Sequence, residues 1–155
     1  MRHRKLLVLL TMLIITLSAC IGQKPTTLEQ KSAYDDLPSE FQEQDAAIQI
    51  SSDQETYSLP VKQLHLIIEN TGNTELVFSN AIYLEKLEAD GWYQIPYKDM
   101  AFTEIARVLA AGETEADEVP VDKLHYQLQE GTYRIVKEFY TGSEQTVLAA
   151  EFEIE

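Results

Sequence analysis

The chain has 155 residues, of which 45% are hydrophobic and 25% are charged, and its formal net charge at pH 7 is −14. These proportions are typical of a folded soluble domain and exclude collagen-like, intrinsically disordered and multi-span membrane proteins. Residues 1–19 hold three of the 12 basic side chains and none of the 26 acidic ones, which leaves −17 on the rest of the chain and disfavours nucleic acids and anionic lipids as partners.

The N-terminus has the pattern of a secretion signal. A basic segment, residues 2–5, precedes the 12-residue apolar run Leu6–Leu17, which is shorter than the about 20 residues of a membrane-spanning helix. The run ends in Leu17-Ser18-Ala19-Cys20, which resembles the lipobox of bacterial lipoproteins. That resemblance implies lipid transfer to the Cys20 thiol and cleavage before it, so residues 1–19 are expected to be a lipoprotein signal peptide. A conventional signal peptide with an incidental cysteine is the alternative.

A lipid on Cys20 would decide where the chain acts. Two acyl chains anchor a protein stably, whereas one gives only marginal binding. We therefore expect a protein held through this lipid at the cell membrane, on its extracytoplasmic face. Cys20 is also the sole cysteine, so neither an intramolecular disulfide nor thiol catalysis is expected.

The next segment, residues 20–44, is expected to be a lipid-anchored flexible tether. It contains Gly, Pro, Thr and scattered charges, with too little periodic apolar surface to offset the entropy of ordering it. The spacing of four apolar residues allows a second interpretation, a weak helix packed on the domain; these are Leu28, Tyr34, Leu37 and Phe41.

Strand patterns dominate residues 45–155, which are enough for one domain with its own core. Alternating or short apolar runs predict strands at Ala47–Ser51, Val61–Glu69, Glu75–Ser79, Ile82–Glu88, Trp92–Ile95, Thr114–Val119, Thr132–Tyr140 and Thr146–Ile154. Turn residues separate them, notably Asn70–Asn73 and the Asp90-Gly91 pair. Met100–Ala110 has apolar residues at helical spacing, and Val121–Leu128 could hold one helical turn.

The fold expected from this pattern is all-β, an antiparallel sandwich of about seven or eight strands with one or two short helices in loops. Val61–Phe139 resembles a bacterial immunoglobulin-like domain common in extracytoplasmic lipoproteins of Gram-positive bacteria. The motifs that carry the likeness are Leu66–Gly72, Leu84–Trp92, Leu109–Glu113 and Leu128–Val136.

One part of that likeness concerns a single tyrosine. Gly131-Thr132-Tyr133 resembles the tyrosine corner of immunoglobulin-like sandwiches, in which the phenol ties the start of a late strand to the preceding loop. The cysteine that follows such a tyrosine two residues later is here Ile135.

Aromatic residues supply the candidate interaction surface, which comprises Trp92, Tyr93 and Tyr97. Tyrosine and tryptophan combine a large apolar face with a polar tip, which suits interfaces. The alternative for Trp92 is a packing role inside the sandwich.

Chemistry that would indicate an enzyme is not found in the sequence, and no catalytic residue, cofactor or metal site is expected. His65 and His125 have no metal-ligand spacing, and no nucleophile motif or phosphate-binding loop is present. Most acidic residues alternate outward on expected strands. The densest acidic group lacks the calcium-loop pattern, and it comprises Glu113, Glu115, Asp117 and Glu118.

The function expected from these features is that of a lipid-anchored, non-catalytic binding or adaptor domain with a protein or cell-envelope partner. A second function class comes from a shorter likeness. Phe102-Thr103-Glu104 leading into Leu109–Glu113 resembles a β-sandwich family of bacterial proteinase inhibitors, and the inhibitory loop would then lie near Met100–Ala110.

Overall fold

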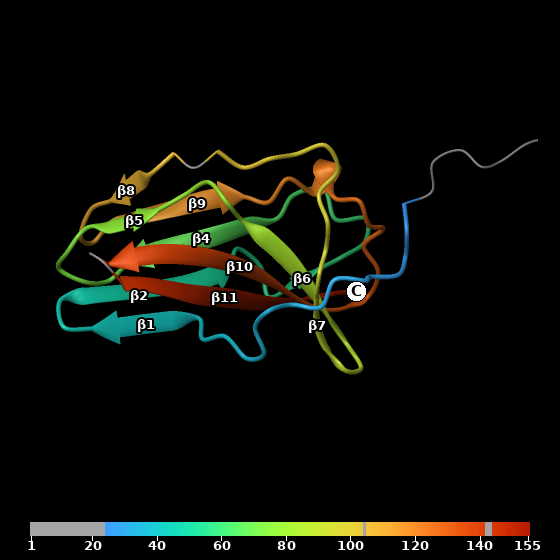
Figure 1. The fold of residues 1–155 in the computed structure, drawn as a ribbon, viewed down its shortest axis with the longest axis horizontal. Coiled ribbons are helices and arrows are strands. Elements are labelled where there is room, and N and C mark those ends of the chain that lie inside the picture. The colour runs from blue at the N-terminus through green and yellow to red at the C-terminus, as the bar shows by residue number, and fades with distance from the viewer. Residues whose placement is uncertain (1–23, 104, 142–143) are drawn as a thin grey trace, which may run out of the picture.

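The computed structural model describes residues 24–103, 105–141 and 144–155; Cys20 and its lipobox lie outside them. The described chain forms two packed sheets, which confirms the predicted β-sandwich (Figure 1). The smaller sheet has the order β1-β2-β4-β9. Its strands are β1 (Glu40–Glu43), β2 (Ala46–Ser52), β4 (His65–Asn70) and β9 (Thr114–Glu118).

The larger sheet is built around two long strands that form a hairpin, as the sequence predicts. It has the order β3-β11-β10-β5-β8, and β6 joins β10 on the same side as β5 and carries β7. Its strands are β3 (Thr56–Tyr57), β5 (Leu76–Phe78), β6 (Tyr83–Glu88), β7 (Gly91–Gln94), β8 (Arg107–Leu109), β10 (Gly131–Thr141) and β11 (Glu144–Ile154). β3 runs parallel to β11, and the other pairs are antiparallel.

Alternation along the strands places the core between the sheets. On β11, Leu148, Ala150, Phe152 and Ile154 are buried, whereas Glu151 and Glu153 are exposed. The facing strands of the smaller sheet bury Ile48, Ile50, Leu66 and Ile68. Full burial of such an apolar side chain contributes about 1.5–3 kcal/mol, so this double layer is the main source of stability.

The turn after β4 carries the chain from one sheet to the other. Gly72 lies against the β1–β2 turn, and its N–H donates to the carbonyl of Ala47 at 3.1 Å. A Cβ atom at this position would lie 2.4 Å from the Ala47 nitrogen and 2.5 Å from the Asp45 oxygen. Glycine is therefore required here by close approach of two backbones.

The helix predicted over Met100–Ala110 is wrong for the described residues of that range. They form no helix and lead into β8, where Leu109 pairs with Leu76 and is buried. Ile105 would face the core in a helix but is 61% exposed; pairing with β5 overrides the helical spacing. The turn predicted within Val121–Leu128 is present as the short 3-10 helix η1 (Val121–Lys123). Within the described ranges no helix is long and apolar enough to span a membrane.

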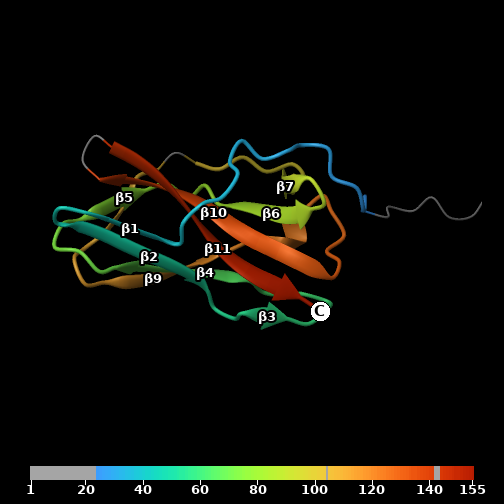
Figure 2. The same ribbon diagram turned by 90° about the horizontal axis from the view of Figure 1, so that it is seen from below.

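The N-terminal segment also differs from its expectation. Instead of a flexible tether, residues 24–39, here called the strap, lie along the sandwich and continue into β1 (Figure 2). Their backbone bonds run to several elements: Gln127 donates to Pro25 at 3.0 Å, and Ala149 donates to Pro38 at 2.9 Å. Backbone hydrogen bonds and tertiary contacts order a segment whose own apolar content is too small to do so.

Candidate binding site on the open side of the sandwich

The larger sheet has edge strands β3, β7 and β8, and the described chain covers β7 but not β8. The strap covers the outer edge of β7. Lys31 forms an antiparallel β-bridge with Tyr93, and Gln94 donates its N–H to the carbonyl of Gln30 at 2.8 Å. β8 pairs with β5 on one side and is the last strand of its sheet in the described chain. No further strand of the described chain pairs with its other edge, although the Asn70 side chain donates to the Leu109 carbonyl at 3.1 Å.

Apolar side chains surround this free edge. Val108 in the middle of β8 is 55% exposed, and Ile105 just before it is 61% exposed. Met100, farther along the segment that leads into β8, is also exposed. We call β8 together with residues 99–103 and 105–106 the open side of the sandwich. An exposed apolar cluster beside an unpaired strand edge is typical of a protein-binding surface.

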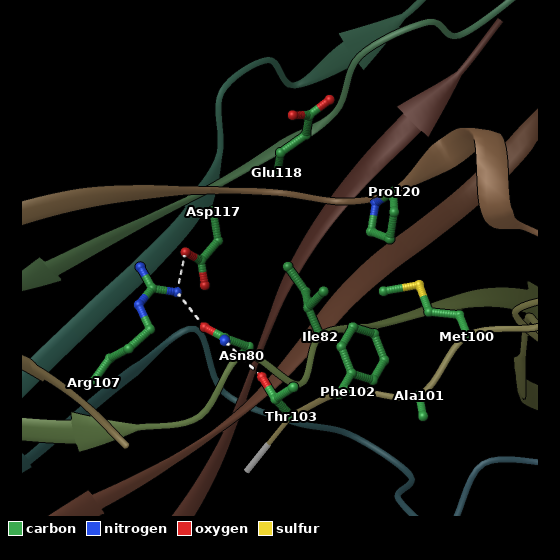
Figure 3. Close-up of a pocket in the computed structure, with 10 residues that line it drawn as sticks. All are labelled: Asn80, Ile82, Met100, Ala101, Phe102, Thr103, Arg107, Asp117, Glu118 and Pro120. Carbon is green, nitrogen blue, oxygen red and sulfur yellow. Dashed lines mark hydrogen bonds and ion pairs between the residues drawn. The ribbon is translucent and has the colours of Figure 1, made fainter. Parts of the chain in front are cut away.

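A cleft of about 320 Å³ lies next to the open side (Figure 3). One part is apolar and is formed by Ile82, Met100, Phe102 and Pro120, and the other part carries Arg107 and Asp117. Asn80 lies between the two parts, donating to the Thr103 hydroxyl at 3.1 Å and accepting from Arg107 at 3.4 Å. The cleft could thus receive a side chain with an apolar body and a polar tip.

Behind the cleft, charged side chains replace apolar ones between the two sheets. Arg107 of β8 pairs with Asp117 of β9 at 2.6 Å and also with Glu115. Lys137 of β10 pairs with Asp117 at 2.8 Å and donates to the carbonyls of Ser79 and Ala81. Both cations also lie near the face of the Phe78 ring, at 4.9 and 5.1 Å from its centroid.

The two cations and two carboxylates in this network balance one another. Lys137 is fully buried, so burial lowers the pKa of its ammonium group, and Asp117 opposes that shift. Removing one partner of such a pair leaves the other charge buried without compensation, which is strongly destabilising. We interpret the network as a set of ion pairs that links the two sheets and supports the wall of the cleft. Arg107 and Lys137 are not among the residues that the sequence predicts to be functional.

Two of the four residues in the acidic group noted in the sequence, Glu115 and Asp117, take part in this network. Glu115 and Asp117 point at Arg107, and Glu113 accepts the Ala110 N–H at 3.0 Å in the turn before β9. In the part of the chain that the structure describes, no three His, Cys, Asp or Glu side chains are grouped so as to hold a metal ion.

Trp92 lies beneath the strap and not on a surface. Its side chain is 7% exposed, and the Arg134 guanidinium lies 4.2 Å from the ring centroid. Arg134 pairs with buried Glu85 at 2.7 Å and donates to the strap carbonyls of Tyr34 and Asp35, at 3.0 and 2.5 Å. We call Arg134, Glu85 and Trp92 the clasp, because together they hold the strap. The prediction that Trp92 belongs to an interaction surface is therefore wrong, since the residue is buried within this clasp.

Tyr93 and Tyr97 lie in two further environments, so the three aromatic residues form no common surface. The Tyr93 hydroxyl donates to the Asp90 carboxylate within its own hairpin. The Tyr97 hydroxyl donates to the Ile82 carbonyl at 3.0 Å, and its ring meets Phe102 edge-on at 5.3 Å. Burial raises the pKa of Tyr97. Tyr97 therefore supports the cleft from behind.

Comparison with known proteins identifies the domain type. A family model described as a bacterial Ig-like domain matches residues 44–153. The search of curated proteins gave no match. Similar solved structures include the ASH / PapD-like domain 7 of human CEP192, with 13% identity, a TM-score of 0.36, and coverage of 68% of this chain and 83% of that one.

Two enzymes also contain a similar portion. A β-glucosidase from Listeria innocua has 20% identity and a TM-score of 0.38, covering 70% of this chain and 16% of that one. An alkylpurine DNA glycosylase from Pseudomonas fluorescens has 16% identity and a TM-score of 0.32, covering 70% of this chain and 30% of that one. These likenesses are too weak to indicate a shared function.

Proposed function

The chain belongs to the bacterial Ig-like domain family, and on that premise we propose that it is a lipid-anchored extracytoplasmic domain that captures a protein partner along β8. It has no catalytic role in this proposal. The observation that carries it is the edge of β8 with which no strand of the described chain pairs, together with exposed Ile105 and Val108. An extended segment of a partner would add as a further strand, with backbone hydrogen bonds supplying affinity.

The cleft would supply specificity for the same partner. A residue of the added strand could place an apolar side chain against Phe102 and Met100 while its polar end meets Asn80 or Arg107. Such convergent polar groups in an apolar setting orient a ligand. The lipid on Cys20 would confine the domain to a thin layer and so raise its effective concentration toward a partner at the same membrane.

Anchoring is tested by Cys20→Ala in the source cell. We expect an uncleaved, unlipidated precursor, because transfer of the lipid requires the thiol of Leu17-Ser18-Ala19-Cys20. The measurement is the intact mass of the purified protein. A Cys20→Ala protein still cut after Ala19 would refute the lipobox assignment.

Partner capture is tested by crosslinking in intact cells. Val108→Glu places a charge on the open side, and Leu87→Glu is the matched control, since Leu87 is also exposed but lies on β6. We expect one protein to be crosslinked by the wild type and by Leu87→Glu and lost with Val108→Glu. Equal capture by both variants would contradict a site on β8.

The inhibitor alternative uses a neighbouring part of the chain, because the described residues between Met100 and β8 could themselves enter a protease cleft. It is tested on the purified protein with extracellular proteases. Stoichiometric loss of one protease's activity that disappears with Val108→Glu would favour inhibition over strand addition.

A further inference from the structure

The strap leaves little freedom between the expected lipid and the folded domain. Three residues separate Cys20 from Lys24, and four Cα-to-Cα steps span at most about 14 Å. Pro25 is already fixed, because its carbonyl accepts the Gln127 N–H at 3.0 Å. The end of the sandwich that carries Pro25 is therefore confined to within a short distance of the lipidated residue.

That end has a shallow apolar groove of about 420 Å³. Leu59, which is 40% exposed, and Val61 form one part of it, and Val121 and Leu128 form another. Lys24, the first described residue of the strap, also lines it. Figure 1 shows the start of the strap beside the C-terminus. Leu59, which lines the groove, donates its N–H to the Glu155 carbonyl at 2.8 Å, so the groove lies there as well.

Charge is distributed unequally between the two ends of the sandwich. Around the groove, exposed Lys24, Lys62 and Lys123 occur with acidic Asp122, Glu130 and Glu155, so this end carries charges of both signs. Asp122 is paired with Lys123 at 2.9 Å. The net charge of the whole chain disfavours anionic lipids, but at this end ammonium groups beside an apolar groove complement the phosphates and acyl chains of a lipid surface.

The opposite end is acidic. It is formed by the turns between β1 and β2, β4 and β5, and β8 and β9, and by the end of β10 and the start of β11 (Figure 1). These places contain no Lys or Arg, and their acidic residues are Glu43, Asp45, Glu75, Glu113 and Glu144. Anionic lipid headgroups repel such an end, which favours its pointing away from a membrane.

We propose that the groove rests on the outer surface of the membrane that holds the Cys20 lipid, so that the domain stands upright with its acidic turns outward. This inference depends on the anchoring proposed above. The short span from Cys20 positions the groove, and the apolar and lysine side chains contact lipid. β8 lies toward the acidic end (Figure 1), and its free edge is thereby held away from the lipid and accessible to a partner.

The orientation is measured with a fluorophore on a single introduced cysteine. Cys20 is the sole native cysteine, and its thiol would carry lipid, so an added thiol is labelled alone. Leu59→Cys places the probe at the groove, and Thr74→Cys places it at an exposed position on the acidic end. Lys62→Cys repeats the groove measurement without removing an apolar side chain.

The full lipidated protein is reconstituted in vesicles of phosphatidylcholine and phosphatidylglycerol that contain a lipid with a nitroxide headgroup. We expect fluorescence to fall at positions 59 and 62 as the nitroxide lipid is increased, and to stay constant at position 74. Equal quenching at both ends, or quenching at position 74 alone, would overturn the orientation.

Two controls separate this inference from the anchoring on which it depends. A protein that lacks the lipid mass and fails to float with vesicles refutes the anchoring itself. A protein that floats but shows no quenching at positions 59 and 62 refutes the orientation alone. Insertion of twelve Gly and Ser residues between Gln23 and Lys24 should weaken the quenching at position 59; undiminished quenching would refute the role of the short span.

Discussion

Tyr133 offers the most direct test of how the sandwich is held together. The residue is fully buried near the start of β10, and its ring stacks on Phe152 with centroids 5.8 Å apart. Its hydroxyl donates to the Gln129 carbonyl at 2.7 Å and accepts the Gln129 N–H at 3.1 Å. These bonds confirm the tyrosine corner expected from the sequence. Tyr133→Phe keeps the ring and removes both bonds.

The expected cost follows from those two bonds. Each contributes about 1 kcal/mol net, so Tyr133→Phe should lower the free energy of unfolding by about 2 kcal/mol. For a domain of this size that corresponds to a fall in Tm of roughly 6–10 °C. Thermal unfolding followed by circular dichroism measures it, with Tyr140→Phe, an exposed tyrosine on the same strand, as the control. A Tyr133→Phe protein that melts with the control would refute the argument.

Three other changes test the strap, the acidic end and the turn after β4. Arg134→Met should cost about 3–5 kcal/mol, because Glu85 stays buried without its guanidinium partner; limited proteolysis should then cut the strap, and a resistant strap would contradict the clasp. A hydrogen bond with Glu144, and then repulsion from it, raises the pKa of Glu43. The stabilisation from this pair is therefore fully present at pH values below the pKa of Glu43 in the unfolded chain, and it is lost as pH rises through the pKa in the folded chain. At pH 7 the two carboxylates repel each other, so Glu43→Gln should raise Tm at pH 7 but not at pH 3. Gly72→Ala should lower the free energy of unfolding by about 1–3 kcal/mol through the clash with Ala47 and Asp45. Urea denaturation measures this loss, with Thr71→Ala, a substitution at an exposed neighbour, as the control. Equal stability of the two variants would show that the close approach is unimportant.

The parts of the fold that the sequence predicts well are those determined locally. The β10–β11 hairpin follows from strict alternation on β11, and the β6–β7 hairpin follows from the Asp90-Gly91 turn. Met100–Ala110 was mispredicted because its apolar spacing is helical, while the structure that forms depends on pairing with β5, about thirty residues away in sequence. Non-local pairing of this kind leaves little trace in the sequence of one segment.

The strap could not be predicted for a related reason. Its order depends on Arg134, which lies about one hundred residues further along the chain and supplies hydrogen bonds to two strap carbonyls. A signal for the network beside the cleft did exist. Lys137 has the same alternation as the buried residues Tyr133, Ile135 and Phe139, which places a cation inside the sandwich and demands a carboxylate opposite it.

Among the sheet edges formed by β1, β7, β8 and β9, one is suited to binding a partner. The strap covers β7, and the edge strands β1 and β9 carry exposed acidic residues, including Glu40 and Glu118, which discourage further pairing. β8 differs, because exposed Val108 lies at its centre and Arg107 is directed inward to Asp117 and Glu115. An exposed apolar edge would promote aggregation unless another molecule covered it, and the edges of β1, β7 and β9 are covered or carry acidic residues. Strand addition at β8 accounts for that exception, and an upright domain on the membrane would keep the same edge within reach of its partner.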